Sequence, residues 1–163
     1  MRAYSVLMLA GLVSMVTLGV LLSASPITAQ SITADVELVP EVFNLHRADA
    51  YGGVITAYVS NLTEDGMLYD VDDINISTVG LYYENQLITM AIRAAIEDDT
   101  LIVKFDAPQV ASYIWTNIAY HMGTIPPQAD YTLPLTVAGE LNNDGQLFAG
   151  SDTIKIILQT ATI

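Results

Sequence analysis

Short runs in which apolar and polar residues alternate recur along this chain, and they constrain its fold more than any other feature. Successive side chains of a β-strand point to opposite faces, so this alternation indicates strands with one buried face. Strands are predicted at Val54–Val59, Ile74–Tyr83 and Leu101–Phe105, and further alternation surrounds Val36 and begins again at Tyr131. Residues typical of turns separate these runs, so the chain is predicted to be mainly β.

The turns themselves can be placed from their composition. The predicted turns are Asn61–Gly66, Glu84–Asn85, Glu97–Asp99 and the hairpin turn Asn143–Gly145. Pro134 lies inside an alternating run. Since proline cannot donate a ladder hydrogen bond, it is expected at a sheet edge or a bulge.

One segment breaks the alternation and predicts a helix. Asp106 followed by Pro108 has the sequence of an N-cap and a first helical turn. Val110, Ile114 and Ile118 then recur at helical spacing. One short crossover helix is therefore predicted over about residues 108–120. Combined with about seven strands, it predicts a single immunoglobulin-like antiparallel β-sandwich domain over residues 30–163.

The chain begins with an apolar segment that carries no charge. Arg2 precedes it, no acidic or basic side chain occurs from Ala3 to Leu22, and small residues lead to Ala29. This is the layout of a secretory signal helix, so residues 1–29 are predicted to be a signal peptide and Gln30 the mature N-terminus. The protein is then secreted, extracellular or attached to the cell surface. An uncleaved anchor is the alternative, because the segment is long enough to span a bilayer, and it would be the protein's only membrane contact.

The remainder of the chain is strongly acidic and contains no cysteine. All 18 acidic residues follow residue 29, against four basic ones, which gives a net charge of about −14; the basic residues are Arg47, Arg93, Lys104 and Lys155. Such a surface repels phosphate backbones and anionic headgroups, so nucleic acid is excluded as a partner. The lack of cysteine excludes a disulfide framework and thiol chemistry.

Six segments follow one another in an order that resembles a known family. They are Val42–Leu45, Val54–Val59, Tyr69–Val79, Leu101–Asp106, Leu135–Leu141 and Phe148–Ile156. They are similar to the recurrent Ig-like β-sandwich module of secreted and cell-surface bacterial and archaeal proteins. The resemblance covers most of residues 34–158 and implies an extracellular appendage or repeat without an assigned catalytic activity. Family members often carry a calcium-type loop where this chain has Ala94–Thr100, and that departure weakens a calcium assignment there.

Two loops supply the candidate metal ligands. Asp70, Asp72 and Asp73, near Glu64–Asp65, form the densest carboxylate group, and gathered carboxylates repel one another unless a cation lies between them. Asn142 and Asp144 offer oxygen ligands at alternate positions, as an EF-type loop does, but Ser151 stands where that loop needs a glutamate. Weakly bound calcium is thus the one cofactor predicted. The alternative for the first loop is a solvated loop, and the alternative for the second is a plain hairpin turn.

Two further groups of residues are candidates for modification or binding. Asn61 and Asn75 begin N-glycosylation sequons. Tyr113 and Trp115 are candidates for a platform that stacks against sugar rings, together with Tyr82, Tyr83 and Tyr120. The alternative is that Trp115 packs the helix onto the sheet.

No motif of a known catalytic type is present in the sequence, and His46 and His121 are adequately explained by structural roles. The protein is therefore predicted not to be an enzyme. The first hypothesis is a non-catalytic module with a structural or adhesive role, whose partner is a protein or polysaccharide at the cell surface. The second is a filament subunit that self-assembles by donor-strand addition through residues 30–41. The third is a carbohydrate-binding module.

Overall fold

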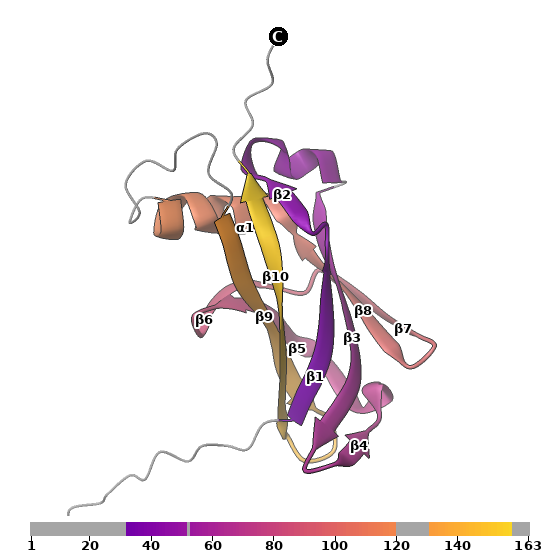
Figure 1. Cartoon of the computed structure of the whole chain (residues 1–163). Helices are drawn as coiled ribbons and strands as arrows, with labels where there is room; N and C mark the ends of the chain where they lie inside the picture. Colours follow the sequence, from indigo (N-terminus) through magenta and orange to yellow (C-terminus); the bar gives the residue numbers. More distant parts are fainter. Residues whose placement is uncertain (1–31, 52, 120–130, 158–163) are drawn as a thin grey trace, which may run out of the picture.

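The computed structural model describes residues 32–51, 53–119 and 131–157, and in these ranges the chain is mainly β with one short α-helix (Figure 1). The predicted signal helix, Tyr120 and His121 lie outside the described residues. The strands are β1 (Ile32–Val39), β2 (Val42–Asn44), β3 (Val54–Glu64), β4 (Met67–Tyr69), β5 (Ile74–Tyr83), β6 (Gln86–Met90), β7 (Arg93–Glu97), β8 (Thr100–Asp106), β9 (Tyr131–Leu141) and β10 (Leu147–Ile157). The helical segments are η1 (Leu45–Tyr51), η2 (Val71–Asp73), α1 (Ala107–Tyr113) and the π-helical η3 (Ile114–Ala119).

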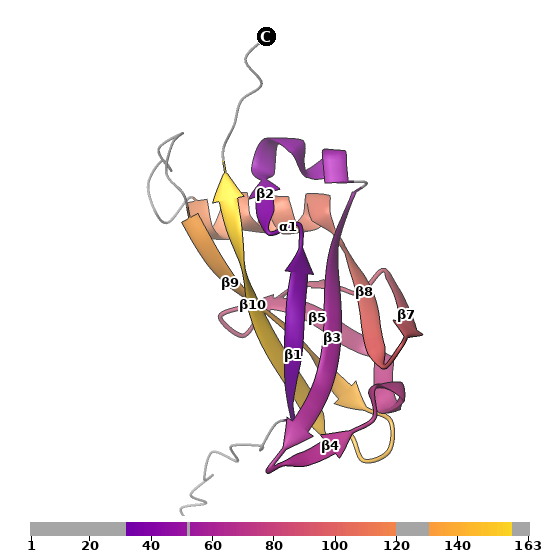
Figure 2. The same cartoon turned by 45° about the vertical axis from the view of Figure 1, so that its right-hand side comes forward.

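All ten of these strands belong to one hydrogen-bonded sheet. Its order is β6-β5-β9-β10-β1-β3-β8-β7, with β2 beside β10 and β4 beside β3. The sheet twists and curls, so that one face of its strands encloses an apolar core (Figures 1 and 2). Side chains from distant strands meet there, among them Ile55, Val103, Leu135 and Ile154, all with no exposed surface.

Helix α1 lies across one end of the curled sheet (Figure 2). The Asp106 carboxylate accepts a hydrogen bond from the backbone N–H of Gln109 at 2.8 Å, which confirms the predicted N-cap. Val110, Ile114 and Ile118 are buried in the core, as their helical spacing predicts. Among the described residues, no helix has the length and apolar character needed to cross a bilayer.

Strand β1 occupies the centre of the sheet. It runs antiparallel to β3 and parallel to β10, beside which Ile32 pairs with Phe148. Further along, the Asp152 carboxylate accepts a hydrogen bond from the N–H of Leu38 at 2.8 Å and so links the two strands by a side chain. At Gly150 the strands approach so closely that a Cβ would collide with the carbonyl oxygen of Ala34.

The predicted end of the third strand at Asn61 is wrong, because β3 continues to Glu64 and turns at Asp65–Gly66. The pairing register between β1 and β3 shifts here, so β3 contains one extra residue, a β-bulge. Asn61 adopts a positive φ of 50° and donates a hydrogen bond from Nδ2 to Asp35 Oδ2 at 2.8 Å. Asn61, a residue type common in turns, instead forms a bulge within a longer strand.

Other local predictions are confirmed. The turn at Glu84–Asn85 forms as predicted, and the turn predicted at Glu97–Asp99 is formed by Asp98–Asp99, since Glu97 belongs to β7. All four turn residues have positive φ, as tight hairpin turns require. Pro134 lies beyond the last paired residues of β5 and β9, Tyr82 and Thr136, so it has a neighbouring strand on one side alone. Strand β7 was not predicted, whereas β6 begins directly after the predicted turn at Glu84–Asn85.

Candidate functional site

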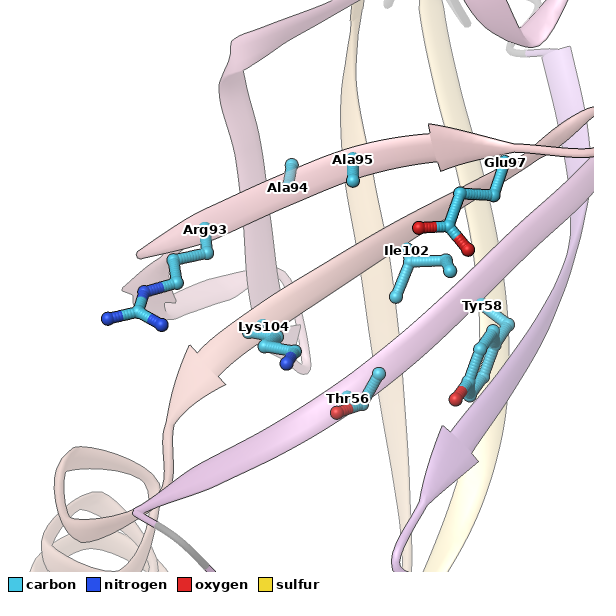
Figure 3. A pocket seen from close by; sticks show the side chains of 8 residues that line it. All are labelled: Thr56, Tyr58, Arg93, Ala94, Ala95, Glu97, Ile102 and Lys104. Carbon is cyan, nitrogen blue, oxygen red and sulfur yellow. The ribbon is translucent and has the colours of Figure 1, made fainter.

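The outward-facing side chains of β3, β8 and β7 lie in rows that follow the pairing register of the three strands (Figure 3). One row is charged and the next is apolar, and together they surround a hollow of about 450 Å³ on the outer face of the sheet. The charged row is Thr56, Lys104 and Arg93, and the apolar row is Tyr58, Ile102 and Ala95. Glu97 closes the hollow at the far end of β7.

The hollow arises from the sizes of neighbouring side chains. Ala95 carries only a methyl group between the much longer side chains of Arg93 and Glu97 on the same face of β7. Tyr58 lines the opposite side from β3 and keeps 38% of its surface exposed. The surface is therefore concave, with a phenol ring on one side and charged groups at both ends.

The two cations of the hollow lie directly opposite each other on paired strands, Arg93 on β7 and Lys104 on β8. Like charges in this position destabilise a sheet. No acidic side chain in the described residues forms an ion pair with either of them. Both groups are hydrogen-bond donors without acceptor capacity, so together they can hold an anionic group such as a carboxylate.

The two loops that supply the candidate calcium ligands lie next to each other. Asp73 Oδ1 accepts a hydrogen bond from Asn143 Nδ2 at 2.8 Å, and the Asp73 carbonyl accepts one from the N–H of Asn142 at 2.7 Å. Asp70 and Asp144 each accept a hydrogen bond from a backbone N–H two residues further on. Within the described ranges, no three acidic or histidine side chains are grouped closely enough to hold a metal. Calcium at Asp70, Asp72, Asp73, Asn142 and Asp144 stays a prediction.

Glu64, which the sequence places near this acidic group, has a partner of its own. The Tyr69 hydroxyl donates a hydrogen bond to Glu64 Oε2 at 2.8 Å. This bond to an acceptor carboxylate, together with desolvation, raises the pKa of Tyr69.

The candidate aromatic residues do not form a single platform. Trp115 is 39% exposed and its ring meets the ring of His46 edge-on, with centroids 5.4 Å apart. The alternative role of Trp115, packing the helix onto the sheet, stays a prediction, while the buried residues Val110, Ile114 and Ile118 hold the helix against the core. The Tyr113 hydroxyl donates to Gln86 Oε1 at 2.9 Å, while Tyr82 lies against Gly80 on the outer face of β5.

Both candidate glycosylation residues lie at irregularities of the sheet. Asn61 forms the bulge in β3, and Asn75 precedes a second register shift, between β5 and β9. Asn75 Oδ1 accepts a hydrogen bond from the Ser77 hydroxyl at 2.7 Å. The Thr78 hydroxyl accepts another from the N–H of Glu140 at 2.9 Å, which replaces a lost ladder bond.

The charged hollow was missed at the level of sequence, although a signal for it exists. Asp98–Asp99 is a two-residue hairpin turn, so Glu97 must pair with Thr100, and counting back along both strands brings Arg93 opposite Lys104. These are two of the four basic residues that follow residue 29. A strand predicted at Arg93–Glu97 would therefore be enough to place Arg93 opposite Lys104.

Comparison with known proteins identifies no relative: no family model, no curated protein and no solved structure matches this chain.

Proposed function

We propose that this protein is a non-catalytic module, secreted or exposed on the cell surface, with a structural or adhesive role. We further propose that its curled sheet is a variant of the Ig-like β-sandwich, in which the two ends of the sheet act as the facing layers. The observation that carries the functional proposal is the charged hollow. Its paired cations offer a contact site for an anionic group on a partner, on the face of a protein whose net charge is −13.

The placement of these cations favours binding over a role in stability. Facing like charges cost the sheet free energy, whereas a carboxylate bound between them would form charge-assisted hydrogen bonds with both. Two described aspartates, by contrast, have evident structural roles: Asp106 caps α1, and Asp152 joins β10 to β1. We therefore place the adhesive contact on this face, with a carboxylate-bearing surface protein or polysaccharide as the partner.

The extracellular setting is supported by the apolar N-terminal segment and by the resemblance to secreted modules. Mass spectrometry of the protein from its native source tests the setting. We expect a mature N-terminus at Gln30, and recovery of an intact Met1 or Arg2 would support a retained anchor instead.

Binding to isolated cell-surface material tests the contact site. The double variant Arg93→Gln/Lys104→Gln should lose most of the binding of the mature protein. The control Arg47→Gln/Lys155→Gln removes the same charge elsewhere and should retain it. Equal binding by both double variants, or turnover of a substrate by the wild type, would contradict the proposal.

Carbohydrate binding is a second candidate, favoured by the exposure of Trp115 beside His46. Aromatic rings with one open face are suited to stacking on sugar rings. In a pull-down with insoluble polysaccharides, Trp115→Ala should abolish retention, whereas Tyr58→Ala, which alters the charged hollow, should not.

Donor-strand assembly remains the other hypothesis. It would require β1 to leave both of its neighbours, β3 and β10, in favour of another subunit. Electron micrographs of the purified protein test it: long polymers would support it, and discrete particles would contradict it.

A further inference from the structure

We propose that two copies of this protein associate by antiparallel pairing of their β7 strands, with the twofold axis at Ala95, so that the two sheets join into one. The inference rests on the proposed contact role of the charged hollow, and it names a second copy of the chain as the partner.

Among the described strands, β7 has a free edge. In the sheet order it is terminal and pairs with β8 alone (Figures 1 and 2). An edge strand presents unpaired N–H and C=O groups that can pair with another chain. Since β7 contains no proline, its backbone can accept a partner over its whole length.

The direction of the backbone groups limits the register of such pairing. The two-residue turn Asp98–Asp99 makes Glu97 and Thr100 a hydrogen-bonded pair, and hydrogen-bonded and non-hydrogen-bonded pairs alternate along an antiparallel ladder. Ala95 and Arg93 therefore also bond toward β8, and the N–H and C=O groups of Ala94 and Ile96 point to the free edge. In a pair centred on Ala95, Ala94 of each copy faces Ile96 of the other, so these groups meet.

The same register matches the charges. Arg93 and Glu97 are the only charged residues of β7, they lie at its two ends, and both face outward (Figure 3). Centred on Ala95, each Arg93 lies directly opposite Glu97 of the other copy, in the non-hydrogen-bonded type of pair where side chains approach most closely. Moving the centre by one residue to Ala94 or Ile96 places Arg93 of one copy opposite Ala95 or Asp99 of the other and leaves Glu97 without a cation. Among the registers that the edge-facing backbone groups allow, charge thus selects one.

This pairing also accounts for the facing cations of the hollow. Glu97 of the second copy supplies the counter-charge that Arg93 lacks among the described residues of its own chain, one strand away from Lys104. Because the contact is the same surface on both copies, it closes as a dimer and does not grow into a filament. Five residues a side make a small interface, so the dimer should be weak and should form at high local concentration.

Sedimentation velocity over a wide range of protein concentrations tests the dimer. The wild type should shift reversibly from monomer to dimer as its concentration rises. Arg93→Glu and Glu97→Arg each place like charges opposite one another twice, and each should raise the dissociation constant at least about tenfold. A wild type that stays monomeric throughout, or that forms open-ended polymers, would overturn the proposal.

Mixing the two variants gives the sharper test. Arg93→Glu presents two glutamates and Glu97→Arg two arginines, so an equimolar mixture should form heterodimers at concentrations where each variant alone stays monomeric. The double variant Arg93→Glu/Glu97→Arg restores both opposite-charge pairs and should dimerise like the wild type. Absence of the heterodimer in the mixture, or dimerisation of the wild type unaffected by either reversal, would contradict the β7 register.

Failure of this inference is distinguishable from failure of the proposed function. Glu97→Arg keeps both cations of the hollow, so in the cell-surface binding assay it should still bind while remaining monomeric. A monomeric wild type that binds cell-surface material through Arg93 and Lys104 would overturn the dimer and leave the adhesive role intact. Dimerisation without binding of cell-surface material would support the dimer and contradict the adhesive role.

Discussion

The two terminal strands of the sheet differ in what limits the pairing of their open edges with other chains. Both β6 and β7 are terminal strands with backbone groups on one side that no further strand satisfies. Side chains of the α1 helix reach β6: Gln109 is bonded to Thr89 and Tyr113 to Gln86. Helix α1 makes no such bonds with β7, which instead carries a charge at each end.

This difference separates a protected edge from a selective one. Strand β6 has no charged residue and exposes apolar side chains such as Leu87 and Met90, so cover by a helix reduces its tendency to pair indiscriminately. Strand β7 is left open, and its charges restrict which strand can pair with it and in which register. An edge that is open but charged in a self-complementary order is suited to one partner.

The largest effect should follow from loosening the helix that covers β6. Ile114 has 1% of its surface exposed, so Ile114→Ala empties a packed site and should cost about 2–5 kcal/mol of unfolding free energy. Denaturant unfolding measures this loss, and Thr116→Ala, on the exposed side of η3, should change little. An unchanged melting temperature for Ile114→Ala would show that the helix is a docking surface and not a cover.

A smaller loss should follow from cutting one contact between α1 and β6. The buried Thr89 hydroxyl bonds to Gln109 Oε1 at 2.7 Å and has only a longer contact, 3.2 Å, to the carbonyl of Met90. Gln109→Ala should therefore cost about 1–2 kcal/mol, seen as a lower denaturation midpoint with an unchanged slope. Ser112→Ala, an exposed residue on the same helix, is the control. Equal midpoints for the two variants would mean that Gln109 does not protect the edge.

At the other edge, in β7, a substitution should raise the unfolding free energy, whereas the two preceding substitutions lower it. Arg93→Glu replaces a cation that faces Lys104 by an anion, so it should stabilise the monomer by about 0.2–1 kcal/mol at low salt. The unfolding free energy is measured at low protein concentration, where association does not contribute. Added salt should reduce the gain, because it screens exposed charges. A destabilised Arg93→Glu monomer would show that the facing cations are tolerated without cost.

The smallest effect concerns Tyr83, which lies beside β6, and the unfolding free energy at alkaline pH. Burial, followed by a hydrogen bond with Glu84, raises the pKa of Tyr83 above its ordinary value. The unfolded chain then loses this proton at lower pH than the native chain, so the contribution of Tyr83 to stability is present at neutral pH and declines as pH rises through that pKa. Tyr83→Phe should flatten the alkaline decline in unfolding free energy. An identical decline in wild type and variant would contradict this assignment.

Much of the local structure could be predicted from the sequence, because it depends on neighbouring residues. The bounds of β5, the Asp106 cap and the turn at Asp98–Asp99 all follow from alternation, capping and turn chemistry. Strand β7 was not predicted because alanines weaken the alternation of apolar and polar residues between Arg93 and Glu97. Asn61 misled because a bulge and a turn require the same positive φ, and only the pairing of β3 with β1 decides between them.

The candidate site could not be predicted because it depends on pairing between strands. Arg93 and Lys104 gain their significance from lying opposite each other, and Tyr58 joins them only through the register of β3 with β8. The contact of Trp115 with His46 likewise depends on tertiary structure, because η1 brings His46 against it. Composition and spacing identify such residues one at a time, without showing which of them meet.

The central position of β1 has a consequence for the order of folding. Its parallel neighbour β10 is the last described strand, so the middle of the sheet can close only after residues 147–157 have been made. Pairings between such distant residues slow folding, and until they form, β1 and β9 each keep an unpaired edge. A chain interrupted before Phe148 would thus lack the seam that joins the two halves of the sheet. Strand β10 thus completes the described sheet from its interior, whereas hairpins such as β7–β8 can form before β10 has been made.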